Sequence, residues 1–321
     1  MSVVDSFKFY VACFFAAPAL LWLFLYSVQH LYCHFRGPVD LKKKYKCDWA
    51  LVTGAGSGIG KSLAETLALQ GLNVVLVSLP MKDLDETFDT LKSQFPKQEF
   101  RKVPVVFDHK TDYMPDIIKA TEDIDVQVVF NNAGYIVTAF FDHTTVDAQL
   151  ANMECNATSC VKITHHFLQK MLQKNLKGCF VFTSSVSGYI PNPFAVMYGA
   201  TKGFVSQFAA SLAIEVQSRG IDVLAVHPSP VASNFFDKAA KLDSLEMAKK
   251  TAVAPSSVPG HMLKFVGRCN LGEFGSMALG MRVVTALVPY DFLTRVFAMG
   301  APFMGDYSSN DKNRGEVKSK K

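Results

Sequence analysis

Residues 49–60 read Trp-Ala-Leu-Val-Thr-Gly-Ala-Gly-Ser-Gly-Ile-Gly, and this stretch decides the fold class. An apolar, β-prone run at Trp49–Val52 leads into a glycine-rich turn, and a long helical pattern follows. Strand, glycine turn and helix in this order suit a dinucleotide, because the helix N-terminus offers free N–H groups to a pyrophosphate. Gly54 would allow the tight turn, Gly58 the close approach of backbone to phosphate, and Gly60 the packing of helix on strand.

Apolar runs alternate with helical patterns along the next 180 residues. This alternation predicts a Rossmann-like, doubly wound parallel sheet around one core, although 321 residues would allow two domains. The expected strands are Ala50–Thr53, Val74–Val77, Val103–Phe107, Val126–Phe130, Cys179–Thr183 and Val223–Val226.

Tyr198 and Lys202 place a phenol and an ammonium four residues apart, on one face of a predicted helix. A free tyrosine titrates near pH 10, and an adjacent ammonium favours the phenolate, so Lys202 is expected to lower the Tyr198 pKa. Taken alone, such a pair is more often a solvated helix face.

Three further polar positions surround this pair. Ser185 ends the apolar run Phe180–Ser185, and the turn Asn131–Gly134 (Asn-Asn-Ala-Gly) follows another expected strand. Asn156 lies in a helical stretch expected from Asn152 to Lys170. The sequon that begins at Asn156 is therefore expected to be unglycosylated.

Together these motifs resemble the short-chain dehydrogenase/reductase family over residues 47 to 235. The family's T-G-x-x-x-G-x-G lies at Thr53–Gly60, and its N-N-A-G, helix asparagine, serine and Y-x-x-x-K follow in the family's order. The resemblance implies hydride transfer between a nicotinamide and a carbonyl–alcohol pair. It also implies a catalytic role for each of four residues. Tyr198 would donate the proton, and Lys202 would lower the Tyr198 pKa and hold the nicotinamide ribose. Ser185 would orient the substrate carbonyl, and Asn156 would hold a water that relays protons.

The resemblance further implies a set of cofactor-binding residues. Asp108 matches an acidic residue that contacts adenine, and Pro228–Ser233 resembles a P-G-x-V-x-T stretch in which Ser229 replaces the usual glycine. The second strand ends in Ser78-Leu79-Pro80, without a carboxylate for the ribose hydroxyl, which favours NADP(H) over NAD(H). The full set is Gly54, Ser57, Gly58, Ile59, Gly60, Ser78, Asp108, Asn132, Tyr198, Lys202, Val231 and Ser233. Lys82 is a further candidate for the phosphate.

No Lys, Arg, Asp or Glu lies between Lys8 and Arg36, and Phe9–Val28 is apolar and long enough to span a bilayer. A cleaved signal peptide and a buried core helix are the competing interpretations. Basic residues cluster after this segment at positions 36–46, so the positive-inside rule places the catalytic domain in the cytosol.

Seven scattered cysteines and no metal-like spacing predict reduced thiols and no metal site. The net charge of +5 is concentrated beside the expected anchor and in the tail Lys312–Lys321. Both clusters are interpreted as membrane-surface signals, with no nucleic-acid partner. The last four residues resemble a dilysine signal and favour the endoplasmic reticulum.

Beyond residue 250 the pattern changes to one rich in Gly, Met, Phe and Ala. Four charges interrupt Leu271–Gly305, so a second transmembrane helix is not expected. An apolar cap over a lipid substrate and ordinary core-packing helices both fit. The expected layout is an anchor and basic linker at 1–46, a catalytic domain at 47–250, a cap at 251–305 and a basic tail at 306–321.

This layout resembles the membrane-bound very-long-chain 3-oxoacyl-CoA reductases and related 17β-hydroxysteroid dehydrogenases. The favoured function is reduction of a ketone on a membrane-partitioned lipid, with fatty-acid elongation as the leading case. Steroid or retinol dehydrogenase, 3-ketosphinganine reductase and an inactive membrane-bound scaffold remain alternatives. The resemblance also implies a possible homodimer through the helix that carries Tyr198.

Overall fold

The computed structural model describes residues 3–233, 235, 250, 252–303 and 305–307, so the basic tail Lys312–Lys321 lies outside the described residues. Its centre is a seven-stranded sheet in the order β3-β2-β1-β4-β5-β6-β7, with every pairing parallel. The strands are β1 Trp49–Thr53, β2 Asn73–Ser78, β3 Phe100–Pro104, β4 Val126–Asn131, β5 Gly178–Thr183, β6 Ile221–Pro228 and β7 Leu271–Phe274.

The order in which the chain adds strands to the sheet changes side between β1 and β4. Successive strands run outward from β1 to β3 on one side and from β4 to β7 on the other. In such a sheet the connecting loops diverge at the reversal and leave a crevice at the carboxyl ends of the strands. The glycine loop after β1 and the Asn131–Gly134 turn after β4 both open into that crevice.

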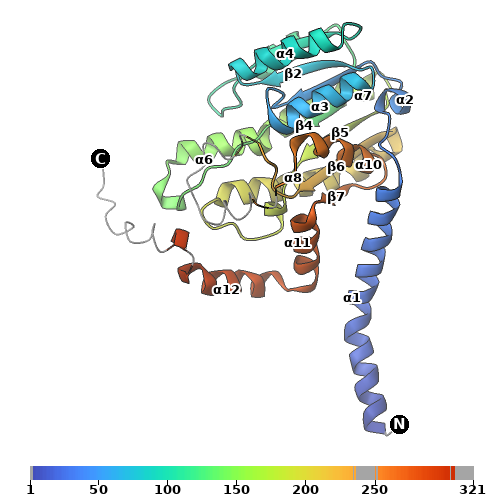
Figure 1. The fold of residues 1–321 in the computed structure, drawn as a ribbon, viewed down its shortest axis with the longest axis vertical. Coiled ribbons are helices and arrows are strands. Elements are labelled where there is room, and N and C mark those ends of the chain that lie inside the picture. The colour runs from blue at the N-terminus through green and yellow to red at the C-terminus, as the bar shows by residue number, and fades with distance from the viewer. Residues whose placement is uncertain (1–2, 234, 236–249, 251, 304, 308–321) are drawn as a thin grey trace.

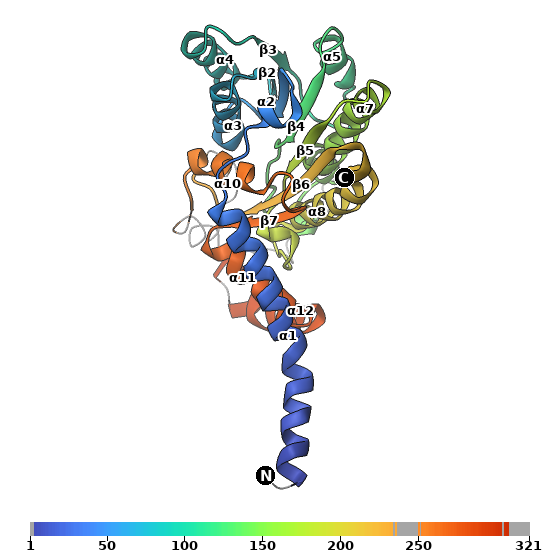
Figure 2. The same cartoon turned by 90° about the vertical axis from the view of Figure 1, so that its right-hand side faces the viewer.

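Helices cover both faces of the sheet, as Figures 1 and 2 show. One face packs against α2, α3, α4 and α10, and the other against α5, α7 and α8. The helices are α1 Val3–Phe35, α2 Leu41–Tyr45, α3 Gly58–Leu69, α4 Lys82–Gln94, α5 Met114–Lys119, α6 Val146–Met153, α7 Ser159–Gln173, α8 Val196–Val216, α10 Val258–Phe265, α11 Ser276–Leu287 and α12 Tyr290–Gly300.

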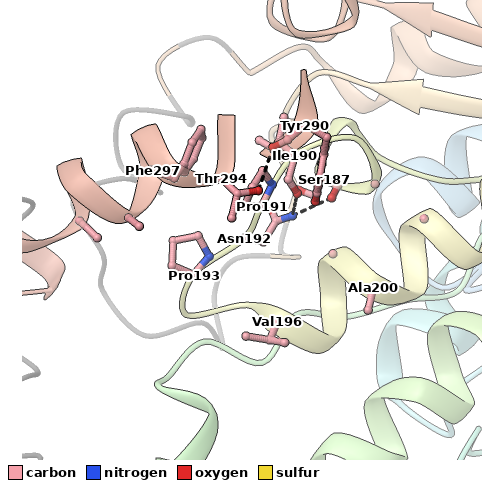
Figure 3. Close-up of a pocket in the computed structure, with 15 residues that line it drawn as sticks. Ser187, Ile190, Pro191, Asn192, Pro193, Val196, Ala200, Tyr290, Thr294 and Phe297 are labelled. Carbon is pink, nitrogen blue, oxygen red and sulfur yellow. Dashed lines mark hydrogen bonds between the residues drawn. The ribbon is translucent and has the colours of Figure 1, made fainter. Parts of the chain in front are cut away.

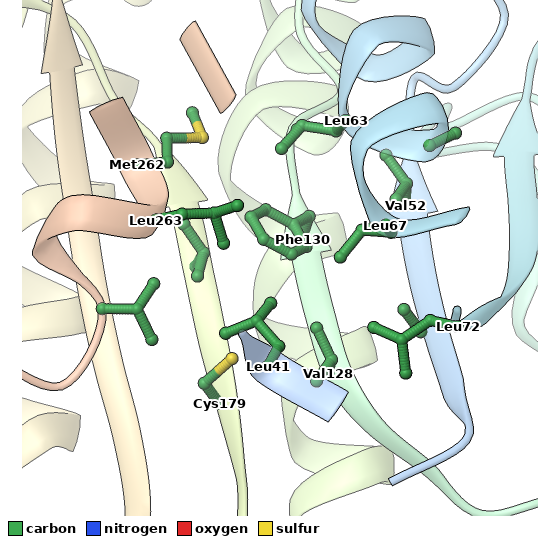
Figure 4. Packing of buried hydrophobic residues seen from close by; sticks show 14 of the residues in the cluster. Leu41, Val52, Leu63, Leu67, Leu72, Val128, Phe130, Cys179, Met262 and Leu263 are labelled. Atoms are coloured by element: carbon green, nitrogen blue, oxygen red, sulfur yellow. The ribbon is translucent and has the colours of Figure 1, made fainter. Parts of the chain in front are cut away.

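The core consists of two apolar layers, one on each face. Side chains alternate along a strand, so Val52 packs in one layer while Leu51 packs in the other. Figure 4 shows Phe130 at the centre of the first layer, with Leu63 and Leu67 of α3 on one side and Leu263 of α10 on the other. A sheet that is buried on both faces explains why the strands read as continuous apolar runs.

The predicted doubly wound sheet is confirmed, with three corrections. β3 begins at Phe100, three residues before the expected start, and β7 was not expected at all. The stretch expected as one helix from Asn152 to Lys170 is α6 and α7 joined by a π-helical turn at Glu154–Thr158. β7 escaped prediction because it has only four residues and carries the charged Glu273.

The basic linker after α1 is folded onto the domain. Leu41 and Tyr45 of α2 are buried in the core, and Lys44 forms an ion pair with Asp222 at 2.6 Å. Lys42 donates to the carbonyl of Gly71 at 2.7 Å. These two lysines thus hold the linker against the sheet. The sequence predicts for them only a role in orienting the chain at a membrane.

α1 and the α11–α12 pair lie on the same side of the domain in both views (Figures 1 and 2). The N-terminal part of α1 projects away from the sheet, and α12 runs across its direction. Over the described residues, no single helix meets the length and hydropathy criteria for a membrane span, whereas Ser276–Leu287 and Tyr290–Phe303 meet them jointly across a bend of 116°.

Candidate active site

The glycine loop has the backbone geometry that its sequence requires. Gly54 and Gly58 have φ of +66° and +54°, a region that side chains other than glycine rarely adopt. A Cβ on Gly60 would lie 2.0 Å from the carbonyl oxygen of Gly54, so helix and strand approach too closely for any side chain there. α3 begins at Gly58, and its N-cap Ser57 makes no side-chain capping hydrogen bond.

Neighbouring predicted residues converge on this loop. Ser78 at the end of β2 accepts a hydrogen bond from the Gly56 N–H at 3.4 Å. A Cβ on Gly58 would lie 3.1 Å from the Cβ of Ser233, which comes from the segment after β6. Val231 in that segment is buried and pairs with Val253.

Three predicted residues are placed differently from the rest of the set. Ile59 packs against the core from the first turn of α3. Asp108 accepts from the Lys110 N–H at 2.8 Å and lies beside His109, so its carboxylate is used within its own turn. Lys82 forms an exposed ion pair with Glu86 at 2.8 Å.

Asn132 ties the carboxyl ends of three strands together. Its side-chain amide donates to the Thr53 carbonyl at 3.1 Å, and its oxygen accepts from the Thr183 hydroxyl at 3.0 Å. Thr53 in turn accepts from the N–H groups of Asn132 and Ala133, both at 2.9 Å. The side chain of Asn132 therefore builds the crevice, and Thr53 and Thr183 are supporting residues that sequence reasoning missed.

Tyr198 and Lys202 lie in the first turns of α8, and Ser185 lies at the end of β5. The Ser185 hydroxyl accepts from the Ser187 N–H at 3.2 Å and lies near enough to Tyr198 to influence the pKa of the phenol. The buried Lys202 ammonium donates to the Thr183 carbonyl at 2.7 Å and lies 5.6 Å from the centroid of the Tyr198 ring. The fold thus brings these three residues together, as the motifs predict.

The pKa of Tyr198 differs from the expectation. Burial raises the pKa of Tyr198 to about 12, and the Ser185 hydroxyl opposes that rise. The expected lowering of this pKa by Lys202 is wrong for the described arrangement, because the ammonium lies beneath the ring and bonds to Thr183. Burial also lowers the pKa of Lys202. The phenol is therefore a protonated donor at neutral pH.

Asn156 lies in the π-helical turn, where an inserted residue re-aims the helix backbone. Its buried side chain accepts from the Tyr135 N–H and donates to the Tyr135 carbonyl, each at 2.9 Å. A Cβ on Gly134 would lie 3.1 Å from the Asn156 oxygen and 3.4 Å from the Lys202 nitrogen. Gly134 is thus the spacer that lets Asn156 and Lys202 share one corner of the site.

A buried polar network behind α8 was not predicted. The Tyr189 hydroxyl donates to Glu273 at 2.9 Å and lies 2.8 Å from Nδ1 of His227. Nε2 of His227 lies 2.8 Å from the hydroxyl of Ser206, which donates to the Lys202 carbonyl at 2.7 Å. Burial lowers the pKa of His227 to about 3, so its imidazole is neutral.

Ser229, which replaces the family's usual glycine, has a structural role. Its hydroxyl accepts from the Ala278 N–H at 3.1 Å and so caps the first turn of α11. A Cβ on Gly275 would lie 2.3 Å from the same oxygen, so glycine is required opposite it. This substitution, which the sequence suggests to be mild, therefore anchors the C-terminal helices to the end of β6.

A cavity of about 520 Å³ lies between α12, the loop 187–193 and α8. Figure 3 shows Thr294 and Phe297 of α12 facing Pro191 and Pro193 of the loop. The α8 residues that line it, such as Ala200, lie on a different face of that helix from Tyr198 and Lys202. The C-terminal helices therefore cover the helix that carries the reactive pair.

The fold and site define a nicotinamide-dependent oxidoreductase, since the glycine cradle fits a dinucleotide and Tyr198, Lys202 and Ser185 meet beside it. The chain belongs to the short-chain dehydrogenase family: a family model for short chain dehydrogenases matches residues 48–243.

Curated relatives of the chain include very-long-chain 3-oxoacyl-CoA reductases. The chain is 32% identical over 296 residues to the very-long-chain 3-oxoacyl-CoA reductase-A of Danio rerio, covering 87% of this chain and 89% of that protein. It is 34% identical over 228 residues to the very-long-chain 3-oxoacyl-CoA reductase of Homo sapiens, covering 67% and 72%.

Solved structures share the fold at lower identity. A 7beta-hydroxysteroid dehydrogenase superposes with a TM-score of 0.72 at 21% identity, covering 81% of this chain and 100% of that one. A short-chain dehydrogenase from Sphingobium yanoikuyae in complex with NADPH has a TM-score of 0.65 at 24% identity, covering 74% and 93%.

Proposed function

We propose that the chain reduces the ketone of a long-chain 3-oxoacyl-coenzyme A to the corresponding alcohol at a membrane surface. The observation that carries the proposal is the placement of Tyr198 beside the buried Lys202, whose ammonium lies 5.6 Å from the ring centroid and bonds to Thr183 at the end of β5. The names of the relatives that share about a third of its residues support this choice of substrate.

The chain's residues have distinct roles in the proposed reaction. Ser185 donates a hydrogen bond to the substrate carbonyl, and Tyr198 transfers its proton to the oxygen as the alcohol forms. A bound nicotinamide supplies the hydride. Lys202 holds its position through Thr183, and Asn156 fixes the backbone corner at Tyr135, from which a relay can return a proton to Tyr198. Burial keeps the Tyr198 hydroxyl protonated at neutral pH, which is the state that a proton donor in ketone reduction requires.

NADP(H) is the proposed cofactor. β2 ends in Ser78-Leu79-Pro80, so no carboxylate stands where the adenosine ribose would lie. Ser78 already contacts the glycine loop through Gly56. A 2′-phosphate there meets hydroxyls instead of a negative charge. The exposed pair of Lys82 with Glu86 is weak enough to open toward the phosphate.

α1 is proposed as a membrane anchor, with the catalytic domain on the cytosolic face of the endoplasmic reticulum. Tyr26 and His30 join α1 to β7, and the uncharged apolar stretch Phe9–Val28 is 20 residues long, about 30 Å of helix. This length matches a hydrocarbon core of about 30 Å. The protruding part exposes large apolar side chains: Val4, Phe7, Tyr10, Phe14, Leu20, Leu21, Phe24 and Leu25.

The segment after residue 250 is proposed as a cap on the lipid side of the site. α12 forms one wall of the 520 Å³ cavity against α8. Beyond the cavity, α8 exposes Phe204 and Ile214. These apolar side chains are available for the proposed homodimer contact.

The substrate is tested by product analysis with the detergent-solubilised full chain. We expect 3-hydroxyacyl-CoA from a long-chain 3-oxoacyl-CoA, formed faster with NADPH than with NADH. A faster rate with NADH would overturn the cofactor proposal alone. Absence of product from any chain length, alongside turnover of a steroid, retinoid or sphingoid ketone, would assign the same site to that lipid. Absence of turnover with every ketone would favour the scaffold.

A further inference from the structure

α12 carries two apolar faces, of which the protein covers only one. Leu293 is buried, and Thr294, Phe297 and Ala301 line the cavity against α8 and the loop 187–193. This inward face accounts for the packing of the helix on the domain.

The opposite face is an exposed apolar stripe. Its first three members, Phe292, Val296 and Met299, are spaced by four and three residues, so they fall within about 60° of one another around a helix of 3.6 residues per turn. Phe303 continues the stripe on the 3-10 turn Ala301–Phe303 that follows α12, and the exposed fractions of the four side chains are 59%, 46%, 75% and 89%. Four large apolar side chains in one line are more than the single exposed residues that a soluble surface normally carries.

From this stripe we infer that α12 lies in the plane of the membrane interface, with its outer face inserted among the lipids at the boundary of headgroups and acyl chains. This inference rests on the proposed membrane anchor. α12 runs across the direction of α1, on the side from which α1 projects (Figures 1 and 2). A helix that crosses the anchor at this level lies flat on the surface that the anchor enters.

Two further features support a bilayer as the occupant. α11 leads to α12 through exposed Val284 and Leu287, so the apolar surface is continuous from the domain to the stripe. The two charges of α12, Asp291 and Arg295, form an ion pair with each other at 2.9 Å beside the stripe, which neutralises them at the interface. An interfacial helix buries its apolar face about 5–10 Å deep, a depth that large side chains of this kind reach.

The consequence concerns access to the active site. α12 faces the loop 187–193 across the cavity, and this loop links Ser185 to the helix of Tyr198. A membrane-seated α12 would bring the mouth of the site to the level at which an acyl chain leaves the bilayer, so a lipid substrate need not cross water.

The test uses tryptophan emission to measure how deeply α12 of the full chain lies in a lipid bilayer. Protein is reconstituted in phosphatidylcholine vesicles brominated at the 6,7 or the 11,12 acyl positions. All variants carry Trp22→Phe, which removes the fluorophore in α1 and leaves the buried Trp49 as a constant background. Met299→Trp reports the stripe, and Leu69→Trp on α3, an exposed position of 74%, is the matched control.

We expect the Met299→Trp emission to shift to shorter wavelength in vesicles and to be quenched more strongly by the 6,7 than by the 11,12 bromines, while the Leu69→Trp emission is unaffected. Protein that floats with the vesicles but shows no quenching at Met299→Trp would overturn the inference and leave the anchor intact. Protein that does not float would overturn the anchor itself, whatever its turnover.

A second variant separates lipid from protein as the occupant. Met299→Glu is expected to lower turnover of a long-chain substrate presented in vesicles, with turnover of a short-chain, water-soluble 3-oxoacyl-CoA unchanged. If Met299→Glu instead converts a detergent-solubilised dimer to a monomer and leaves long-chain turnover unchanged, a second copy of the chain covers the stripe and the inference is wrong.

Discussion

Tyr198 is a protonated donor because its surroundings exclude water from the hydroxyl while the Lys202 ammonium is directed to the Thr183 carbonyl. The same arrangement explains why the spacing of the pair predicts proximity but not pKa. The spacing of four residues places both side chains on one helix face, but it does not specify which carbonyl the ammonium will bond.

The titration of Tyr198 follows from its burial. Its pKa of about 12 lies above the ordinary value near 10, so the folded protein keeps this proton where the unfolded chain releases it. Its contribution to stability is full below about pH 10 and is lost as the pH rises toward about 12. In the cofactor-free protein, the 295 nm absorbance of wild type minus Tyr198→Phe is expected to stay flat up to about pH 10. A difference signal that rises near pH 7 or 8 would contradict this account.

Two glycines give a matched pair of substitutions. Gly60→Ala forces its Cβ against the Gly54 carbonyl, so the cradle must shift, and a misplacement of this size typically lowers kcat/KM by about 10²-fold. A Cβ on Gly260 in α10 meets no atom within 4 Å, so Gly260→Ala is expected to stabilise the fold by about 0.5–1 kcal/mol. The fluorescence of bound NADPH checks the effect of Gly60→Ala on the cradle, and thermal unfolding checks the effect of Gly260→Ala on stability. Normal NADPH binding by Gly60→Ala would contradict the assignment of the cradle.

At the scale of elements, β7 holds the C-terminal helices and α1 together through one buried carboxylate. Glu273 accepts from Tyr189 and Tyr26, and Arg282 of α11 lies 3.5 Å away. The Tyr189 ring also lies 4.9 Å from the Arg282 guanidinium. This cluster links the anchor, the cap and, through His227, the helix of Lys202.

Removal of that carboxylate is expected to be costly. Glu273→Ala leaves the half-buried Arg282 and two tyrosine hydroxyls without their acceptor, a change that typically destabilises by about 1–3 kcal/mol. The control is Asp291→Ala, which breaks the exposed Asp291–Arg295 pair and should cost at most about 0.5 kcal/mol. Urea unfolding in detergent compares the two. Equal effects would show that the cluster does not hold these elements together.

The strands could be predicted from the sequence because each leaves a local apolar pattern. Five of the six expected strands are confirmed to within a few residues, because a sheet buried on both faces requires unbroken apolar runs. The predicted position of β3 is too far along the chain because Val105 and Phe107, which are apolar and buried, lie beyond the end of the strand. The partners of Glu273 come from three segments, namely α1, the turn at Tyr189 and α11, and no local pattern records which of them will meet.

At the scale of the whole molecule, the parallel sheet sets the direction of the site, and α1 with the α11–α12 pair would set the direction of the proposed membrane surface. The crevice between β1 and β4 receives the cofactor, whereas the cap meets α8 from the opposite side. The cap therefore covers the helix that carries Tyr198 on the face away from the reactive pair.

The anchor is tested by alkaline carbonate extraction of membranes that contain the full chain. We expect wild type to stay in the pellet, and Leu20→Arg with Leu21→Arg to release it, because each arginine costs about 2.5–3.5 kcal/mol at the centre of a membrane helix. Ile214→Arg, at an exposed position on α8, is the control and should stay in the pellet. Release of wild type by carbonate would show that α1 does not span the membrane.

The central claim is that Tyr198 protonates a ketone on a long-chain acyl thioester. The most direct measurement is the NADPH-dependent reduction of a long-chain 3-oxoacyl-CoA by the solubilised full chain, compared between wild type and Tyr198→Phe, with NADPH binding measured in both. The account predicts that Tyr198→Phe binds NADPH normally and loses about 10²–10⁴-fold in kcat. Reduction at the wild-type rate by Tyr198→Phe would contradict it.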